Sequence, residues 1–135
     1  MATVLRLREI RKVWRIERTG EEMVALDGIS LDVEQGELLV IVGPSGCGKS
    51  TLLQIVAGLE QPTSGAIEVT ASNSHQKLTG MVFQEYALFP WRTVLENIVF
   101  GPEVRGVPRD QREARAQALI DLVHLKGFEH RYPHE

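Results

Sequence analysis

The chain has 135 residues, and its 15 Lys and Arg residues against 18 Asp and Glu residues leave a formal net charge of −3 at pH 7. A hydrophobic fraction of 43% argues against intrinsic disorder, and the slightly acidic balance argues against nucleic-acid binding. The longest apolar run, Leu38 to Val42, is far shorter than the ~20 residues of a membrane-spanning helix. Length and composition indicate one globular domain.

Two stretches of alternating apolar and polar residues predict the first strands. Leu5 and Leu7 alternate with arginines, and the residues from Ile29 to Glu34 alternate in the same way. The polar stretch from Arg15 to Glu22 predicts a loop or hairpin tip between them. Leu38 to Val42 is entirely apolar, which is typical of a strand covered on both faces.

A helix is predicted directly after the glycine-rich segment Gly43–Thr51. Apolar residues recur there at helical spacing, and Gly58 with Pro62 brings the helix to a close. Ala66 to Thr70 and Met81 to Phe83 predict two short strands, with a polar loop over 71–80 between them.

Two further helices are expected toward the end of the chain. Thr93 and Glu96 have the spacing of a capping box, so a helix is predicted from Val94 to Phe100, ended by the pair Gly101-Pro102. A longer helix is predicted from Arg109 to about Leu125.

The second of these helices has signals at both of its ends. Pro108 suits its start, and Gly127 suits its C-cap. The charge cluster from Arg109 to Arg115 is interpreted as a solvated helix face, with a membrane or partner contact as the alternative.

One motif carries recognisable chemistry. Gly43 to Ser50 matches G-x-x-x-x-G-K-[ST], in which successive backbone amides hold phosphate oxygens at a helix N-terminus. Lys49 would place its ammonium against the β- and γ-phosphates, and Ser50 would offer its hydroxyl to Mg²⁺. The predicted nucleotide-binding residues of this loop are Gly43, Pro44, Ser45, Gly46, Cys47, Gly48, Lys49, Ser50 and Thr51.

Phosphoryl transfer needs more than this loop. A carboxylate that helps to hold the metal normally follows a second apolar strand, and no run of four apolar residues followed by Asp-Glu occurs downstream. Asp121 lies in a predicted helix, and Asp32 lies on a strand before the loop. The residues therefore support nucleotide binding without supplying a complete ATPase.

Cys47 and the four histidines have weaker functional interpretations. A single cysteine excludes an internal disulfide and fits a reducing compartment. Cys47 is interpreted as a tolerated loop residue, with a reactive thiol as the alternative. The four histidines lack the spacing of metal ligands and are interpreted as surface or packing residues. They are His75, His124, His130 and His134.

Several segments together resemble the front part of an ABC transporter ATP-binding subunit of the nitrate, sulfonate or taurine importer type. The resemblance extends from Leu5 to Glu135. It implies an α/β P-loop fold, with a β-subdomain and P-loop core over 1–84 and the start of a helical subdomain over 85–135. The segments that carry it are Ile41–Leu53, Ala57–Glu60, Pro62–Gly65, Val82–Gln84, Leu88–Trp91 and Thr93–Asn97.

The resemblance also assigns roles to individual residues. Trp14 would stack on adenine, with a core tryptophan as the alternative. Gln84 would contact Mg²⁺ and the attacking water, which makes Lys49 and Gln84 the catalytic candidates and Ser50 and Gln84 the metal candidates. The segment Phe89–Trp91 either faces the permease or forms local core.

The implied cofactors are ATP and Mg²⁺. The implied partners are a transmembrane permease, a second copy of the subunit and, indirectly, a substrate-binding protein, with no nucleic acid. The subunit would lie in the cytoplasm, on the inner face of the cell membrane.

The sequence also departs from the family's pattern, because several of the family's functional segments are missing from it. The family's Leu-Ser-Gly-Gly segment, its second apolar strand with the metal aspartate and catalytic glutamate, and its switch histidine would follow a segment like Tyr132–Glu135. The chain is therefore expected to be truncated, poorly soluble alone and uncertain as an ATPase. A non-hydrolysing nucleotide-binding fragment is the alternative; a small-molecule kinase is disfavoured by the segment Val82–Gln84.

Overall fold

The computed structural model describes residues 2–70, 79–85 and 87–135. The chain divides into two compact units, Met1–Met81 and Val82–Glu135, and each is described by itself. Within the described residues, the first unit contains three strands and one helix, and the second contains two helices. Among the described residues, no helix is long and apolar enough to cross a membrane. The predicted loop over 71–80 lies largely outside the described residues.

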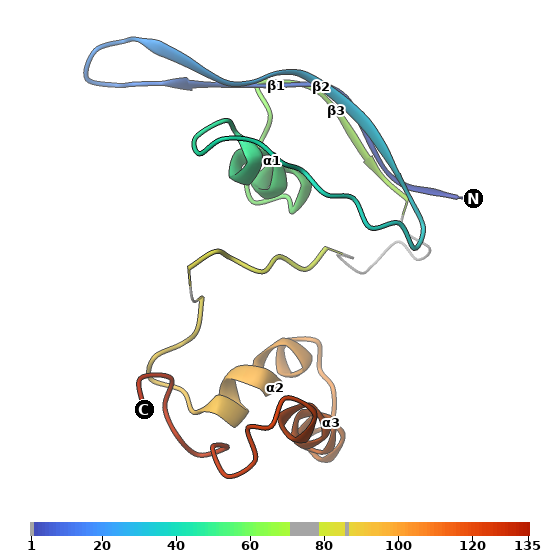
Figure 1. Ribbon diagram of the computed structural model, residues 1–135, viewed down its shortest axis with the longest axis vertical. Coiled ribbons are helices and arrows are strands. Elements are labelled where there is room, and N and C mark those ends of the chain that lie inside the picture. Colours follow the sequence, from blue (N-terminus) through green and yellow to red (C-terminus); the bar gives the residue numbers. More distant parts are fainter. Residues whose placement is uncertain (1, 71–78, 86) are drawn as a thin grey trace. The chain divides into compact units, whose positions relative to one another are not determined.

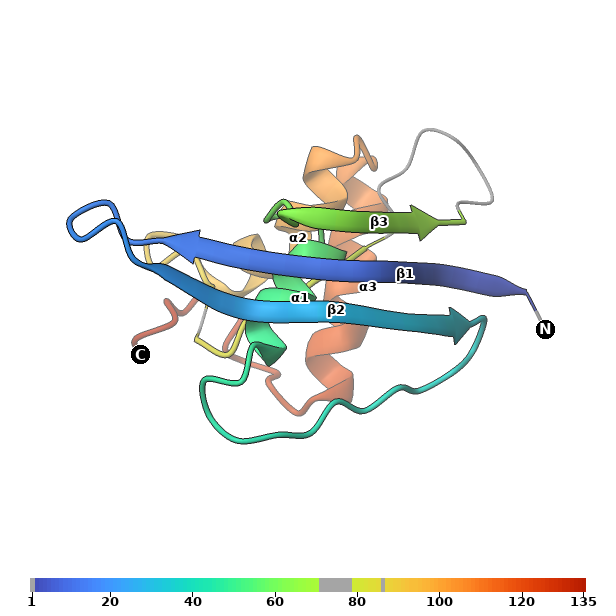
Figure 2. The same cartoon turned by 90° about the horizontal axis from the view of Figure 1, so that it is seen from above.

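The first unit is built on an antiparallel sheet with the strand order β2-β1-β3. Its strands are β1 (Thr3–Arg15), β2 (Glu22–Glu34) and β3 (Ser64–Val69), as Figure 2 shows from above. The polar stretch between β1 and β2 is a turn, so the predicted hairpin tip is confirmed. Strand β3 begins two residues before the predicted start at Ala66.

Helix α1 (Lys49–Val56) covers one face of this sheet and closes the core of the unit (Figure 1). The buried core residues are Leu7, Ile10, Leu26, Leu52 and Ile55. The predicted end of this helix is confirmed, because it stops at Val56 and Gly58 follows with a left-handed φ of 73°. The core lies between β1, β2 and α1, and the glycine-rich loop leads directly into α1.

A bulge in β1 decides which residues face that core. Leu7 and Ile10 are both 0% exposed although three positions separate them, which strict alternation in a strand forbids. The register with β2 shifts between these two residues, and Glu9 there adopts a left-handed φ of 48°. The backbone N–H of Glu9 donates to Ser30 Oγ at 2.9 Å. An extra residue in a strand moves every later side chain to the opposite face.

Two predicted strands are wrong. Leu38 to Val42 forms no strand, and Leu38 and Val42 are 89% and 85% exposed. Met81 to Phe83 is also irregular, with Val82 97% exposed. A strand needs a neighbour to accept and donate its backbone hydrogen bonds. Within the described residues, no strand pairs with either segment.

The second unit consists of α2 (Val94–Val104) and α3 (Arg109–Leu122) packed on each other. The predicted capping box is confirmed: Glu96 N–H donates to Thr93 Oγ1 at 3.3 Å, and Thr93 N–H donates to Glu96 Oε2 at 2.7 Å. The buried residues between the helices are Val99, Ala116 and Ile120.

The predicted end of α2 at Gly101-Pro102 is wrong, because the helix continues through both residues to Val104. A proline so close to the end of a helix removes only one hydrogen bond. The carbonyl groups of Gly101 and Pro102 remain paired, accepting from Arg105 N–H at 3.3 Å and from Val107 N–H at 3.0 Å.

The predicted C-cap of α3 at Gly127 is also wrong. The helix ends at Leu122, and His124 adopts the left-handed conformation with φ 60°. His124 N–H donates to Asp121 O at 3.2 Å and Leu125 N–H donates to Ile120 O at 2.9 Å, the hydrogen-bond pattern of a Schellman motif. The chain therefore turns three residues earlier than glycine placement predicts.

Candidate nucleotide-binding site

The glycine-rich loop runs into the N-terminus of α1 and presses against β2. Gly48 is the N-cap, with φ 97° and ψ 1°. A Cβ at this position would collide with the carbonyl oxygen of Ala25 and lie 2.9 Å from Leu26 Cδ2. Both the backbone conformation and the close approach to β2 require glycine here.

Lys49 folds its side chain back into the loop. Its ammonium donates to Gly43 O at 2.7 Å and to Pro44 O at 2.6 Å, and it lies 3.5 Å from Cys47 Sγ. An ammonium group has three donors and is strongly attracted to phosphate oxygens. The loop thus surrounds the positively charged ammonium of Lys49. A bound anion would replace the neutral carbonyl oxygens as the partner of this ammonium.

Helix α1 adds its own positive end to this site. Leu52 N–H donates to Gly48 O at 2.9 Å, so the amides of the first turn before it have no acceptor within the helix. These amides and the helix dipole favour an anion at this end. A phosphate group fits this set of donors, which consists of backbone amides and one ammonium.

The other predicted loop residues lie at the surface of this site. Ser50 is exposed in the first turn of α1. No group of three or more His, Cys, Asp or Glu side chains comes together anywhere in the described parts of the chain. Ser50 is the loop residue whose hydroxyl could serve as a ligand of Mg²⁺. Gly43, Pro44, Ser45, Gly46 and Cys47 are exposed, and Thr51 is half-buried.

Trp14 lies near the end of β1 and is half-buried. The ammonium of Lys12 lies 4.2 Å from the centroid of its ring. The same ammonium donates to Glu60 Oε1 at 2.6 Å and to Gln61 O at 2.8 Å, in the segment that follows α1. The hydrogen bond from Lys12 lowers the pKa of the Glu60 carboxyl below its ordinary value of 4.5.

Sequence reasoning found Trp14 but missed Lys12 and Glu60. Lys12 is 8% exposed, the only buried charged residue of the described chain. Strict alternation along β1 would place Lys12 on the same face as Arg6 and Arg8 and so predicts an exposed side chain, because nothing in the sequence marks the bulge at Glu9. The only available signal is the short distance along the chain from Lys12 to Trp14.

Gln84 belongs to the second unit and is exposed. The structure places Trp14, Lys49 and Ser50 in the first unit. The contact of Gln84 with a metal ion at the loop therefore stays a prediction.

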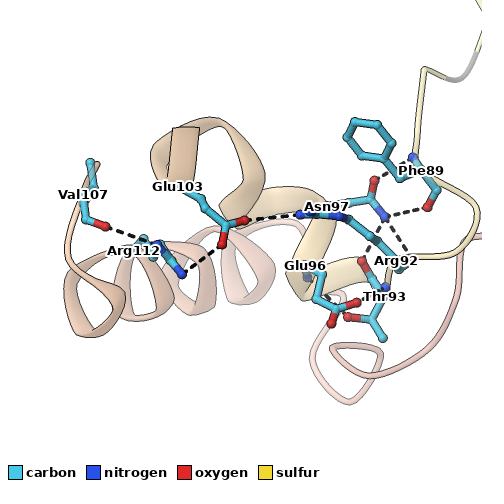
Figure 3. Close-up of polar contacts among 8 residues, drawn as sticks. All are labelled: Phe89, Arg92, Thr93, Glu96, Asn97, Glu103, Val107 and Arg112. Carbon is cyan, nitrogen blue, oxygen red and sulfur yellow. Dashed lines mark hydrogen bonds and ion pairs between the residues drawn. The ribbon is translucent and has the colours of Figure 1, made fainter. Parts of the chain in front are cut away.

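Asn97 organises the aromatic segment of the second unit (Figure 3). Its Nδ2 lies 3.1 Å from Phe89 O, 3.0 Å from Arg92 O and 2.9 Å from Thr93 O, and its Oδ1 accepts from Phe89 N–H at 2.9 Å. An amide group has only two N–H donors, so the three carbonyl groups share them. One side chain thus fixes the whole turn before α2.

The aromatic residues of this turn have different surroundings. The Phe89 ring packs edge-on against Phe100, with 4.7 Å between centroids, and it is half-buried. Trp91 is 71% exposed. Of the two interpretations of this segment, local packing describes Phe89. The Trp91 ring lies 5.5 Å from the Phe89 ring, and a contact of Trp91 with a permease stays a prediction.

Ion pairs to residues of α2 and α3 also hold this turn in place. Glu103 lies between two arginines, with Arg92 Nη1 at 3.3 Å and Arg112 Nη2 at 3.2 Å (Figure 3). The Arg92 guanidinium also lies over the Phe100 ring, 4.9 Å from its centroid. Arg92 therefore joins the turn that carries Trp91 to the body of α2.

Comparison with known proteins decides the family. Residues 26–135 match the family model described as ABC transporter. The chain belongs to this family. The predicted resemblance is confirmed at the level of the ABC transporter ATP-binding domain.

Curated relatives agree with the family. The chain is 43% identical over 140 residues to an uncharacterized ABC transporter ATP-binding protein of Methanocaldococcus jannaschii, covering 100% of this chain and 51% of the relative. It is 45% identical over 134 residues to a spermidine/putrescine import ATP-binding protein of Acidothermus cellulolyticus, covering 96% and 34%. A taurine import ATP-binding protein of Roseobacter denitrificans is 43% identical over 121 residues, covering 86% and 44%. The chain thus spans about half or less of these relatives' length.

A solved structure confirms the fold. The chain superposes with a TM-score of 0.76 and 29% identity on a dimeric ATP-binding cassette in a post-hydrolysis state, bound to ADP and Pi. The match covers 96% of this chain and 62% of that one. The chain therefore has the α/β fold of an ABC ATPase cassette, over part of the domain.

Proposed function

We propose that the chain is the nucleotide-binding part of an ABC importer ATPase subunit and that the loop Gly43–Thr51 holds ATP with Mg²⁺. One observation carries the proposal: Lys49 places its ammonium inside the loop at the N-terminus of α1, 2.7 Å from Gly43 O and 2.6 Å from Pro44 O. The solved cassette that the chain resembles is bound to ADP and Pi, which supports a nucleotide as the ligand.

The roles of the other residues follow from this proposal. Trp14 stacks on the adenine base, and Ser50 and Gln84 contact Mg²⁺, with Gln84 orienting the attacking water. Residues 1–84 form the β-subdomain and P-loop core, and residues 85–135 begin the helical subdomain. Bound Mg²⁺ would neutralise charge on the phosphate oxygens, while Lys49 and the amides of α1 hold them in place.

The partners are a transmembrane permease, which Trp91 contacts, and a second copy of the subunit, with a substrate-binding protein acting through the permease. This places the subunit in the cytoplasm, against the inner face of the membrane. Relatives named as import ATP-binding proteins and the dimeric cassette support this assignment. The proposed solute is of the nitrate, sulfonate or taurine type. Taurine and sulfate importers among the relatives support it, although a polyamine importer matches as well.

The proposal is tested with Lys49→Ala in the full-length protein. Loss of a charged hydrogen-bond donor to phosphate should weaken ATP binding by at least about tenfold, measured by calorimetry. Lys126→Ala removes the same charge from the second unit and serves as the matched control. An unchanged ATP affinity in Lys49→Ala would show that the loop does not hold the phosphates.

A non-hydrolysing nucleotide-binding module is the second candidate function. The groups that support it are those of the loop around Lys49, which suffice for binding a nucleotide. Multiple-turnover phosphate release that disappears in Lys49→Ala would exclude it. Nucleotide binding without turnover would support it.

A further inference from the structure

The environment of Trp14 is more specific than that of a surface aromatic residue. Lys12, two positions earlier on β1, is 8% exposed and directs its ammonium over the indole ring at 4.2 Å. A cation over an aromatic face is attracted by the electrons of the ring, more strongly when water is excluded. One face of the indole is therefore occupied from within the fold, and a stacking ligand must use the other face.

The Lys12 ammonium is itself held from the far end of α1. Glu60 Oε1 lies 2.6 Å from it, and Gln61 O lies 2.8 Å from it. The Glu60 side chain is 29% exposed and that of Lys12 is 10% exposed, so this ion pair is shielded more than the others in the described chain. Two short hydrogen bonds from one ammonium group, to a carboxylate and to a carbonyl oxygen, define its position well.

The bulge at Glu9 makes this arrangement possible. It brings Ile10 and Lys12 to the face of β1 that carries buried Leu7. Trp14 follows Lys12 by two positions and shares that face. Without the extra residue, Lys12 and Trp14 would lie on the opposite side of the sheet from α1.

We propose that Lys12 and Glu60 are a positioning pair that holds the Trp14 ring in place for the adenine base. The inference rests on the proposed function, in which Trp14 stacks on that base. The pair ties the end of β1, which carries the aromatic ring, to the segment that leaves α1. Because Lys49 and Ser50 open the same helix, the pair sets the position of the base-stacking ring relative to the phosphate-binding loop.

This role predicts an effect confined to the base. Lys12→Gln in the full-length protein should weaken ATP binding by about fivefold, the order expected for loss of a shielded cation–π contact. Binding of inorganic tripolyphosphate, which has no base, should change by less than about twofold, because the phosphate loop is untouched. Lys12→Arg keeps the cation and should restore most of the ATP affinity.

Two further variants complete the test. Glu60→Gln should give the same selective loss, and its effect should not add to that of Lys12→Gln, because both remove one interaction. Arg11→Gln is the matched control, since the neighbouring ion pair between Arg11 on β1 and Asp27 on β2 is exposed. The part of the ATP-induced change in tryptophan fluorescence that disappears in Trp14→Phe reports on Trp14, and the same part should disappear in Lys12→Gln.

The outcomes separate the two proposals. If Trp14→Ala leaves ATP affinity unchanged, the stacking part of the proposed function is wrong, and the positioning pair fails with it. If Trp14→Ala weakens ATP binding but Lys12→Gln does not, only the positioning pair is overturned. Equal losses of ATP and tripolyphosphate in Lys12→Gln would show a general structural role and would also overturn it.

Discussion

Each of the two units of the chain is stabilised internally by a different kind of interaction. In the first, α1 packs apolar side chains against a sheet, and the buried residues form one continuous core. In the second, the buried residues among those that the structure describes are Val99, Ala116 and Ile120, while hydrogen bonds and ion pairs around Asn97 and Glu103 fix the turn before α2. Apolar packing is non-directional, whereas hydrogen bonds specify geometry. We therefore expect the stability of the first unit to depend mainly on how well its apolar core is filled. The stability of the second unit should depend mainly on individual hydrogen bonds and ion pairs.

The largest effect is expected from a cavity in the first unit. Ile55 is 1% exposed on the face of α1 that meets the sheet. Ile55→Ala should lower the free energy of unfolding by about 3 kcal/mol, measured by urea denaturation of the full-length protein. Leu53→Ala, at a position 50% exposed on the same helix, is the control and should cost less than about 1 kcal/mol. Equal losses of unfolding free energy in the two variants would show that the buried apolar core does not stabilise this unit.

A smaller effect, with a different signature, is expected in the second unit. Asn97→Ala leaves the N–H of Phe89 and three carbonyl groups without their side-chain partner. It should cost about 2 kcal/mol. The anisotropy of the fluorescence that Trp91 contributes, obtained as the difference from Trp91→Phe, should fall as the turn loosens.

Gln111→Ala is the matched control for this change, since it removes an exposed amide from α3. Its anisotropy should equal that of the parent protein. A stability loss in Asn97→Ala without any fall in anisotropy would mean that Asn97 does not hold the turn that carries Trp91.

The smallest effect concerns the acid sensitivity of the second unit. The hydrogen bond from Thr93 N–H lowers the pKa of Glu96 below its ordinary value of 4.5. Because the folded pKa is the lower one, the stabilisation is complete above the unfolded pKa and is lost as the pH falls through the folded pKa. Glu96→Gln keeps an acceptor for Thr93 but cannot titrate, so its unfolding should depend less on pH below about 4.5.

The check is a series of unfolding curves from pH 6 down to about pH 3, where Glu carboxyl groups titrate. Glu22→Gln, at an exposed position on β2, is the control and should keep the parent profile. Identical profiles for Glu96→Gln and the parent would show that the capping box does not contribute to the acid transition.

Local patterns in the sequence predicted much of this structure. The glycine-rich loop, the helix after it and the capping box at Thr93 and Glu96 are confirmed, because each depends on residues a few positions apart. The end of α3 shows the limit of such patterns. Glycine at position 127 predicted the cap, but the Schellman hydrogen bonds formed at His124.

The sequence by itself thus determined the glycine-rich loop, the helix after it and the family. Only the tertiary structure decided which face of β1 is buried, because the bulge at Glu9 depends on pairing with β2. It also decided that Leu38 to Val42 forms no strand, although its residues favour one. Strand pairing joins residues far apart in the chain, so a strand's own residues cannot specify its partner. The contact between Lys12 and Glu60 has the same non-local origin.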